Sequence, residues 1–325
     1  MRVILTLAAV ALMSAHGAPQ GTNGRLVVLN KEDATLVTVD PASGKILGRV
    51  VTGEGPHEVA VSDDGRTAFV ANYGTGPAPG STISIIDLTA HKEIKRVDVT
   101  PLRRPHGITF ADGHVYFTAE ANRLVARYDP ASDKLDWLLG TGQTGTHMVQ
   151  VDRDGARLYT ANIGSNTMSI FERGQNPMAW NHTVVPVGRG PEGFDVSPDR
   201  RELWAAHSQD GGVSVIDLAT KSVTATIDLA TKRSNRLKFT PDGKLVLVSD
   251  LDAGELVVVD ASTRKERKRI ALGRMPEGIL IPPSGTTAFV AVAGDGQVAV
   301  VDVNTLEVAR RIDTGRGPDG MAWAQ

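Results

Sequence analysis

The chain has 325 residues, no cysteine, and 35 basic against 37 acidic side chains. The lack of cysteine excludes disulfides, thiolate nucleophiles, thiolate-ligated metals and the covalent attachment of a c-type haem. The nearly balanced charge argues against a nucleic-acid partner, because binding to a phosphate backbone depends on clustered lysine and arginine.

The first seventeen residues have the pattern of a secretory signal peptide. Arg2 supplies a positive start, residues 3–13 form an apolar run, and Ala15 to Gly17 offer small residues for cleavage. This run is too short to cross a bilayer, which takes about 20 apolar residues. We therefore expect residues 1–17 to be a signal peptide and residues 18–325 to form one domain. That domain should be periplasmic or secreted, without stable membrane insertion.

One sequence phrase recurs along the rest of the chain: Gly-x-x-Pro, a polar residue, an alternating apolar run, a turn and a further strand. It is clearest at residues 53–59, 188–194 and 273–279. The turn positions that follow it lie 42 to 48 residues apart, at Gly65, Gly113, Gly155, Arg200, Gly243 and Gly285. Such spacing is typical of four-stranded propeller blades of about 40–50 residues.

Each repeat carries four strand patterns, as at residues 57–62, 67–73, 81–88 and 92–99. β-Branched residues alternate in these segments, and Gly, Pro, Asp and Asn separate them. No helical period intervenes. The third strand typically ends at an Asp that can bond its own downstream backbone and hold a turn; these residues are Asp87, Asp129, Asp217, Asp260 and Asp302.

The strand count predicts an all-β fold, a seven-bladed β-propeller with four antiparallel strands per blade. Residues 25–51 supply only three strands, and the chain ends on a single strand that begins at Asp319. We expect the N- and C-terminal strands to share one blade, because this pairing leaves no open sheet edge.

Two repeats carry a family resemblance. Residues 68–72, Ala-Phe-Val-Ala-Asn, and residues 158–162, Leu-Tyr-Thr-Ala-Asn, each follow an Asp-Gly turn. They resemble the YVTN family of seven-bladed propellers, which is related to lactonase-type and cytochrome d1-type propellers. The resemblance covers essentially the whole chain after the signal peptide. It implies the fold, whereas for function it implies only a group that includes lactonases, haem-d1 binders and surface-layer proteins.

Equivalent positions of successive blades surround the channel of a propeller, so a column in the repeat becomes a ring in space. The residue after the repeat Pro begins the innermost strand and should face the channel mouth. We call this column the mouth ring; it consists of His57, His106, His147, Glu192, Asn235, Glu277 and Asp319. A second column, after the second strand, adds the expected funnel residues Asn72, Asn162, His207 and Asp250, with Glu120 in the third blade.

Three ring histidines on adjacent blades, His57, His106 and His147, form a candidate site for a divalent metal such as Zn, Mn, Fe or Ca. The ion would polarise a lactone or ester carbonyl and activate water. Glu192, Glu277 and Asp319 are then the candidates for the general base. The alternative interpretation is a solvated polar rim whose side chains do not converge on one ion.

Two residues depart from the repeat. Glu120 stands where neighbouring blades have Asn, and Arg236 follows Asn235 in a blade that has Ser instead of Pro. Both are candidates for holding a substrate carboxylate or a proton. An ordinary ion pair between blades is the alternative interpretation.

These observations predict an exported propeller enzyme, a lactonase-like hydrolase or a lyase, that acts on a small polar substrate at the channel mouth. A lactone or an ester is the favoured substrate. Two alternatives stay open. One is a non-catalytic periplasmic protein that binds a ligand, a haem-like macrocycle or a protein partner through the same face. The other is a structural repeat protein without chemistry in its channel.

Overall fold

The computed structural model describes residues 24–176 and 179–325. The described residues form 28 strands and two short 3-10 helices. The predicted signal peptide, residues 1–17, lies outside this part of the chain. No helix of the described residues is long and apolar enough to cross a membrane.

The strands follow one another as antiparallel hairpins. In chain order, the elements are β1 (Arg25–Asn30), β2 (Thr35–Val39), β3 (Ile46–Val51), β4 (Pro56–Val61), β5 (Thr67–Gly74), β6 (Pro79–Asp87), β7 (Lys92–Asp98), β8 (Pro105–Ala111), β9 (His114–Ala119), η1 (Glu120–Asn122), β10 (Leu124–Asp129), β11 (Lys134–Gly140), β12 (Thr146–Val151), β13 (Arg157–Asn162), β14 (Thr167–Arg173), β15 (Trp180–Pro186), β16 (Pro191–Val196), β17 (Glu202–His207), β18 (Gly212–Asp217), β19 (Ser222–Asp228), β20 (Ser234–Phe239), β21 (Leu245–Asp250), β22 (Glu255–Asp260), β23 (Lys265–Ala271), β24 (Pro276–Leu280), β25 (Thr287–Val292), η2 (Ala293–Asp295), β26 (Gln297–Asp302), β27 (Glu307–Asp313) and β28 (Pro318–Ala324).

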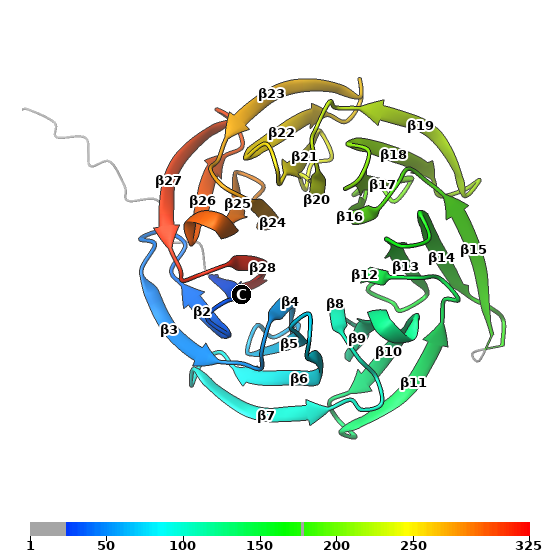
Figure 1. The fold of residues 1–325 in the computed structure, drawn as a ribbon, viewed down its shortest axis with the longest axis vertical. Coiled ribbons are helices and arrows are strands. Elements are labelled where there is room, and N and C mark those ends of the chain that lie inside the picture. Colours follow the sequence, from blue (N-terminus) through cyan, green and yellow to red (C-terminus); the bar gives the residue numbers. More distant parts are fainter. Residues whose placement is uncertain (1–23, 177–178) are drawn as a thin grey trace, which may run out of the picture.

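The strands group into seven four-stranded sheets, which confirms the predicted propeller. Blade 1 has the order β28-β1-β2-β3, and blades 2 to 7 each take four consecutive strands from β4 onward. Strand β28 pairs antiparallel with β1, so the two ends of the described chain share a blade as predicted. Figure 1 shows the blades arranged in a ring, and the innermost strands around the central channel are β28, β4, β8, β12, β16, β20 and β24.

Apolar side chains hold neighbouring blades together. The described residues contain seven buried apolar clusters, one for each pair of adjacent blades. Blade 7 meets blade 1 through Phe289 and Val298 against Leu26 and Val28, an interface of the same kind as the other six. Burial of each such side chain contributes about 1.5–3 kcal/mol. The ring therefore closes by repeating one interface, without a special clasp.

A β-bulge recurs in every innermost strand among the described residues. In blade 2, Pro56 pairs with Asn72 and Val59 pairs with Val70, so His57 and Glu58 together oppose one residue of β5. The other six blades show the same shift at the same place. A bulge bends the strand and redirects side chains. It thus sets the direction of the mouth-ring residue and of the residue after it.

In each blade, one residue directly follows the mouth-ring residue. Over most of the circle this position alternates between glycine and a residue with a larger side chain. Around blades 2 to 7 and then blade 1, it reads Glu58, Gly107, Met148, Gly193, Arg236, Gly278 and Gly320. The glycines permit close approach of the next strand: a methyl group on Gly320 would overlap the carbonyl oxygen of His57, and one on Gly278 would overlap that of Asp319. The missing side chains also leave space inside the channel.

This close packing predicts that Gly320→Ala destabilises the protein. The added methyl group meets backbone rather than a side chain that could move, so we expect a loss of about 1–3 kcal/mol in the free energy of unfolding. Urea denaturation followed by tryptophan fluorescence would measure it. Gly76→Ala is the matched control, because nothing lies within 4 Å of that position. Equal stabilities of the two variants would contradict the packing.

Candidate active site at the channel mouth

The mouth ring closes much of one end of the channel. Each member is the second residue of its innermost strand. Only His57 is partly exposed, whereas His106 is 2% exposed, His147 8% and Asp319 1%. A ligand from the mouth face therefore meets His57 first, together with partly exposed neighbours from other loops.

The three predicted histidines lie side by side. The ring centres of His57 and His106 are 4.9 Å apart, and those of His106 and His147 are 3.7 Å apart. Tyr73, at the end of β5, lies against both His57, at 4.6 Å, and His106, at 5.2 Å. The guanidinium of Arg104 lies 4.8 Å from the centre of the Tyr73 ring. Four aromatic rings from three blades thus form one continuous wall.

His57 is held as a neutral base. Its Nδ1 lies 2.8 Å from the carbonyl oxygen of Gly55. Since a carbonyl can only accept, Nδ1 carries the proton and donates it, which leaves Nε2 unprotonated in the neutral ring. Burial lowers the pKa of His57 to about 4, although the charge of Asp319 acts in the opposite direction. The imidazole is consequently uncharged at neutral pH.

His147 has the hydrogen-bond pattern of an oriented ligand or base. Its Nδ1 lies 3.2 Å from Oε2 of Glu120 and donates to this carboxylate, while Nε2 is buried without a partner. A carboxylate on the far nitrogen is the usual means of orienting a histidine that binds a metal. Nδ1 of His106 is likewise buried without a partner, and burial and the neighbouring His147 lower the pKa of His106 well below its usual value.

Lys31, Glu277 and Asp319 form a second group beside the histidines. Lys31 contacts Oε2 of Glu277 and lies 3.2 Å from Oδ2 of Asp319. Burial, together with the charge of Asp319, raises the pKa of Glu277 to about 8. Burial would also raise the pKa of Asp319, but the charges of Lys31 and Arg236 outweigh it and lower that pKa. One carboxyl is thus protonated at neutral pH and its neighbour is ionised.

Arg236 is the buried cation of the channel. Its NH2 lies 2.9 Å from Oε1 of Glu58 across the ring and 3.8 Å from Oδ1 of Asp319, and its NH1 lies 3.5 Å from Oε1 of Glu192. Asn235 donates to the same Glu192 oxygen at 2.6 Å. The structure therefore places Arg236 in an ion-pair network between blades, as the alternative interpretation of this residue expects. Glu120 is held similarly by His147.

The second predicted column serves the blades themselves. Asn72 bonds Thr82 and Ser84 of the same blade, and Asn162 bonds Thr167 and Ser169. Asp250 accepts the backbone N–H groups of Lys232 and Arg233 and so holds the incoming loop. His207 bonds Asp210 in the next turn at 2.9 Å. Their polar groups secure the loops that carry the mouth ring.

Four site residues escaped the sequence analysis: Lys31, Glu58, Tyr73 and Arg104. Tyr73 comes one position after Asn72 of the second column, Lys31 follows Asn30 at the end of β1, and Arg104 precedes the repeat Pro. Glu58 and Arg236 each follow a mouth-ring residue and so occupy the same column of the repeat. Opposite charges in one column could have predicted an ion pair across the channel.

The three mouth histidines do not form the tightest potential ligand set among the described residues. His114, Asp129 and Asp136 are the group whose potential ligand atoms all lie within 4.8 Å of one another. Both carboxylates are already engaged, Asp129 with a turn N–H and Asp136 with Arg127. The mouth histidines would have to turn to share one ion.

Comparison with known proteins places this chain in a family. The model of the Cytochrome D1 heme domain matches residues 81–286. The chain belongs to this family. It is 25% identical over 318 residues to the dihydro-heme d1 dehydrogenase of Pseudomonas aeruginosa, which covers 81% of the chain and 64% of that protein. It is also 33% identical over 84 residues to antigen Lp49 of Leptospira interrogans, which covers 26% of the chain and 18% of the antigen. The chain thus spans less than two thirds of the length of either relative.

Solved structures agree on the propeller. The periplasmic gluconolactonase PpgL of Pseudomonas aeruginosa superposes with a TM-score of 0.75 at 19% identity, covering 93% of this chain and 99% of that one. Hydrazine synthase of Kuenenia stuttgartiensis gives 0.73 at 17% identity, covering 90% and 99%. Dihydro-heme d1 dehydrogenase NirN in complex with DHE gives 0.63 at 18% identity, covering 90% and 64%. Likeness at these identities concerns the fold.

The protonated state of Glu277 predicts a pH-dependent effect of Glu277→Gln. The folded pKa of about 8 lies above the ordinary value of 4.5. Between these values only the folded wild type keeps the proton, so its stability falls as pH rises through this window. Gln does not titrate and retains the hydrogen-bonding shape of the protonated acid.

We expect the free energy of unfolding of the variant to rise relative to that of the wild type, by on the order of 2 kcal/mol or more between about pH 5 and pH 9. Urea denaturation at a series of pH values would measure this difference. Parallel stability profiles for the two proteins would contradict a protonated Glu277.

Proposed function

We propose that the channel mouth hydrolyses a lactone or an ester by acid–base chemistry. The observation that carries this proposal is that the pKa of His57, about 4, lies below that of Glu277, about 8, the reverse of their ordinary order. At neutral pH a neutral His57 and a protonated Glu277 therefore accompany the ionised Asp319. Environments that separate the pKa values of two titratable groups in this way are typical of a base and an acid that act together.

The roles follow from the atoms that each group has free. Nε2 of His57 takes a proton from water as the water oxygen attacks the carbonyl carbon. Asp319 stabilises the imidazolium that forms. When the bond between the carbonyl carbon and the leaving oxygen breaks, Glu277 gives its proton to that oxygen, and the product is a hydroxy acid. Lys31, 22% exposed in its side chain, lies where it can stabilise negative charge on the carbonyl oxygen.

The remaining predicted catalytic residues take supporting roles in this proposal. Arg236 and Lys31 keep Asp319 ionised, Glu192 is fixed by Arg236 and Asn235, and Glu120 orients His147. PpgL, a gluconolactonase by name, supplies the first substrate to test. We also propose that the protein is exported to the periplasm, on the signal-peptide pattern of residues 1–17.

The proposal predicts that His57→Gln and Glu277→Gln each lower kcat/KM for gluconolactone by about 100-fold or more, the usual contribution of a general base or acid. Acid release in a pH-stat would measure the rate. The wild-type profile should be bell-shaped, with limbs near the pKa of His57, about 4, and that of Glu277, about 8. His91→Gln is the control, because His91 bonds Thr38 away from the mouth ring. Full activity in either mouth variant, or no hydrolysis of any lactone or ester by the wild type, would refute the proposal.

A second candidate function is the binding of an iron tetrapyrrole, which the family and the dihydro-heme d1 dehydrogenase relative favour. The donor chemistry fits: Nε2 of His147 is buried without a partner, and Glu120 fixes the ring through Nδ1. Exposed Arg123, without a side-chain partner among the described residues, and partly exposed Arg104 would meet carboxylates of the macrocycle. Such a group would supply redox chemistry. His147 would hold its iron, and its mouth-ring neighbours would first have to open.

Metal content and visible absorbance of protein purified without chelator separate these candidates. For tetrapyrrole binding, we expect about one equivalent of iron with a haem-like absorbance band, both lost in His147→Ala. A divalent ion held by His57, His106 and His147 would instead give about one equivalent of colourless metal that is lost in the triple Ala variant. A metal-free, colourless protein that hydrolyses lactones would support the acid–base proposal over both metal-dependent candidates.

A further inference from the structure

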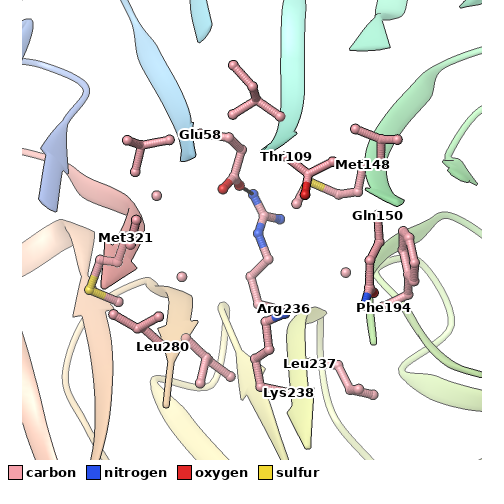
Figure 2. A pocket seen from close by; sticks show the side chains of 18 of the residues that line it. Glu58, Thr109, Met148, Gln150, Phe194, Arg236, Leu237, Lys238, Leu280 and Met321 are labelled. Carbon is pink, nitrogen blue, oxygen red and sulfur yellow. Dashed lines mark hydrogen bonds and ion pairs between the residues drawn. The ribbon is translucent and has the colours of Figure 1, made fainter. Parts of the chain in front are cut away.

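A cavity of about 400 Å³ occupies the channel beneath the mouth ring. Figure 2 shows Arg236 reaching across it to Glu58, with side chains of the other blades around them. Lining residues near the far ends of the innermost strands, among them Thr109, Gln150 and Leu280, are partly exposed. The cavity therefore opens on the face opposite the histidines, and a ligand can enter it without passing the proposed active site.

The charged side chains that line the cavity have partners of opposite charge. NH2 of Arg236 lies 2.9 Å from Oε1 of Glu58, and both side chains are mostly buried, at 10% and 14% exposure. Burial raises the pKa of Glu58, and the charge of Arg236 opposes this effect. Lys238, 42% exposed in its side chain, lies 3.4 Å from Oδ1 of Asp195. Each of the two lining cations therefore has a carboxylate beside it.

The acidic residues of the mouth ring, next to the cavity, are compensated as well. Asp319 lies 3.2 Å from Lys31, and Glu192 lies 3.8 Å from Arg233. Glu277, with its pKa raised to about 8, holds a proton at neutral pH. A ligand in the cavity thus meets no unbalanced charge on the described lining residues. Because an ion buried without a free partner of opposite charge is costly, the cavity disfavours cations and anions alike.

Some hydrogen-bonding groups of the lining have no partner among the described residues. Arg236 donates through NH2 to Glu58 and through NH1 to Asn235, which leaves its Nε–H without an acceptor. Figure 2 shows its guanidinium crossing the open space rather than lying along a wall. The Nε–H group can therefore donate to an oxygen of a ligand, and that oxygen need not carry a charge.

The rest of the wall is largely apolar and suits a compact body. Met148, Phe194, Leu280 and Met321 line the space, which glycines of three blades widen. The volume lies at the small end of ligand sites, which hold about 300–1,000 Å³. Mostly apolar walls with a few polar groups that orient the ligand are typical of small-molecule sites.

We propose that this cavity binds a small uncharged organic molecule, a carbonyl group on an apolar body of about one aromatic ring. The carbonyl oxygen accepts a hydrogen bond from Nε of Arg236, while the body packs against the methionines and Phe194. A carboxylate of the same shape would lie near Glu58, and an ammonium would lie near Arg236. Either charge would meet a repulsion that burial strengthens.

Four probes with one phenyl ring each test this preference: acetophenone, ethylbenzene, benzylamine and benzoate. Benzoate has the shape of acetophenone, with a charged oxygen in place of the methyl group. Methionine methyl groups labelled with ¹³C report the site, because Met148 and Met321 line the cavity. Met168, buried in a blade interface, and Met275, 46% exposed outside the cavity, are internal controls. Met148→Leu and Met321→Leu assign the signals.

We expect acetophenone to shift the signals of Met148 and Met321 alone and to bind about tenfold tighter than ethylbenzene, as a hydrogen bond to a charged group implies. Benzylamine and benzoate should each bind about tenfold or more weaker than acetophenone, because neither charge finds a free partner. Leu280→Trp, or Thr109→Phe if the first does not fold, should abolish binding by filling the space.

Glu58→Gln tests the charge balance, because it removes one negative charge beside Arg236 and retains the shape of the side chain. Benzoate should gain about tenfold or more in this variant, as a bond between an ionised acceptor and an arginine implies. The affinity for acetophenone should change by less than about twofold. An unchanged affinity for benzoate would overturn the assignment of charge to this ion pair.

His57→Gln separates this proposal from the lactonase proposal, since the variant should lose hydrolysis and keep acetophenone binding. Benzoate or benzylamine binding to the wild type as tightly as acetophenone would overturn the preference for an uncharged ligand, and ethylbenzene doing so would overturn the hydrogen bond to Arg236. No shift of Met148 or Met321 with any probe up to its solubility would overturn the site itself.

Discussion

Pairing of β28 with β1 is the contact on which the other features depend. It places Asp319, from the last strand of the chain, beside Lys31, which follows the first, and so completes the mouth ring at blade 1. The same pairing presses Gly320 against the backbone of His57 and thereby positions the proposed base. Without this closure, blade 1 would lack its innermost strand and two open sheet edges would remain.

Buried charge in the channel is balanced in two ways, by ion pairs and by a proton. On the mouth side, Lys31 and Arg236 keep Asp319 ionised while Glu277 takes up a proton. Deeper in the channel, Arg236 pairs with Glu58 across the ring, and Arg233 lies 3.8 Å from Glu192 of the mouth ring. Because burial makes uncompensated charge costly, Glu277 takes up a proton, whereas Glu58, Glu192 and Asp319 each lie beside a cation. One arginine connects the two ends.

Most of the fold could be predicted from the sequence, because the repeat encodes strands, turns and blade number in every unit. The mouth ring could also be predicted, since one column of the repeat becomes one ring. Lys31 and Tyr73 could not be read that way, because they lie outside both columns, Lys31 just after β1 and Tyr73 at the end of β5. The order of the pKa values of His57, Glu277 and Asp319 depends on burial and on distances between blades. A repeat alignment carries neither quantity.

An odd number of blades prevents a regular alternation of small and large residues around the inner wall. Strict alternation of glycine with a larger side chain can close only in a ring with an even number of members. With seven members two like neighbours must meet somewhere, and here they are Gly278 and Gly320, on blades 7 and 1. Two adjacent blades therefore lack a side chain at this position, at the seam where the chain ends meet. The parity of the ring thus breaks the symmetry of the channel.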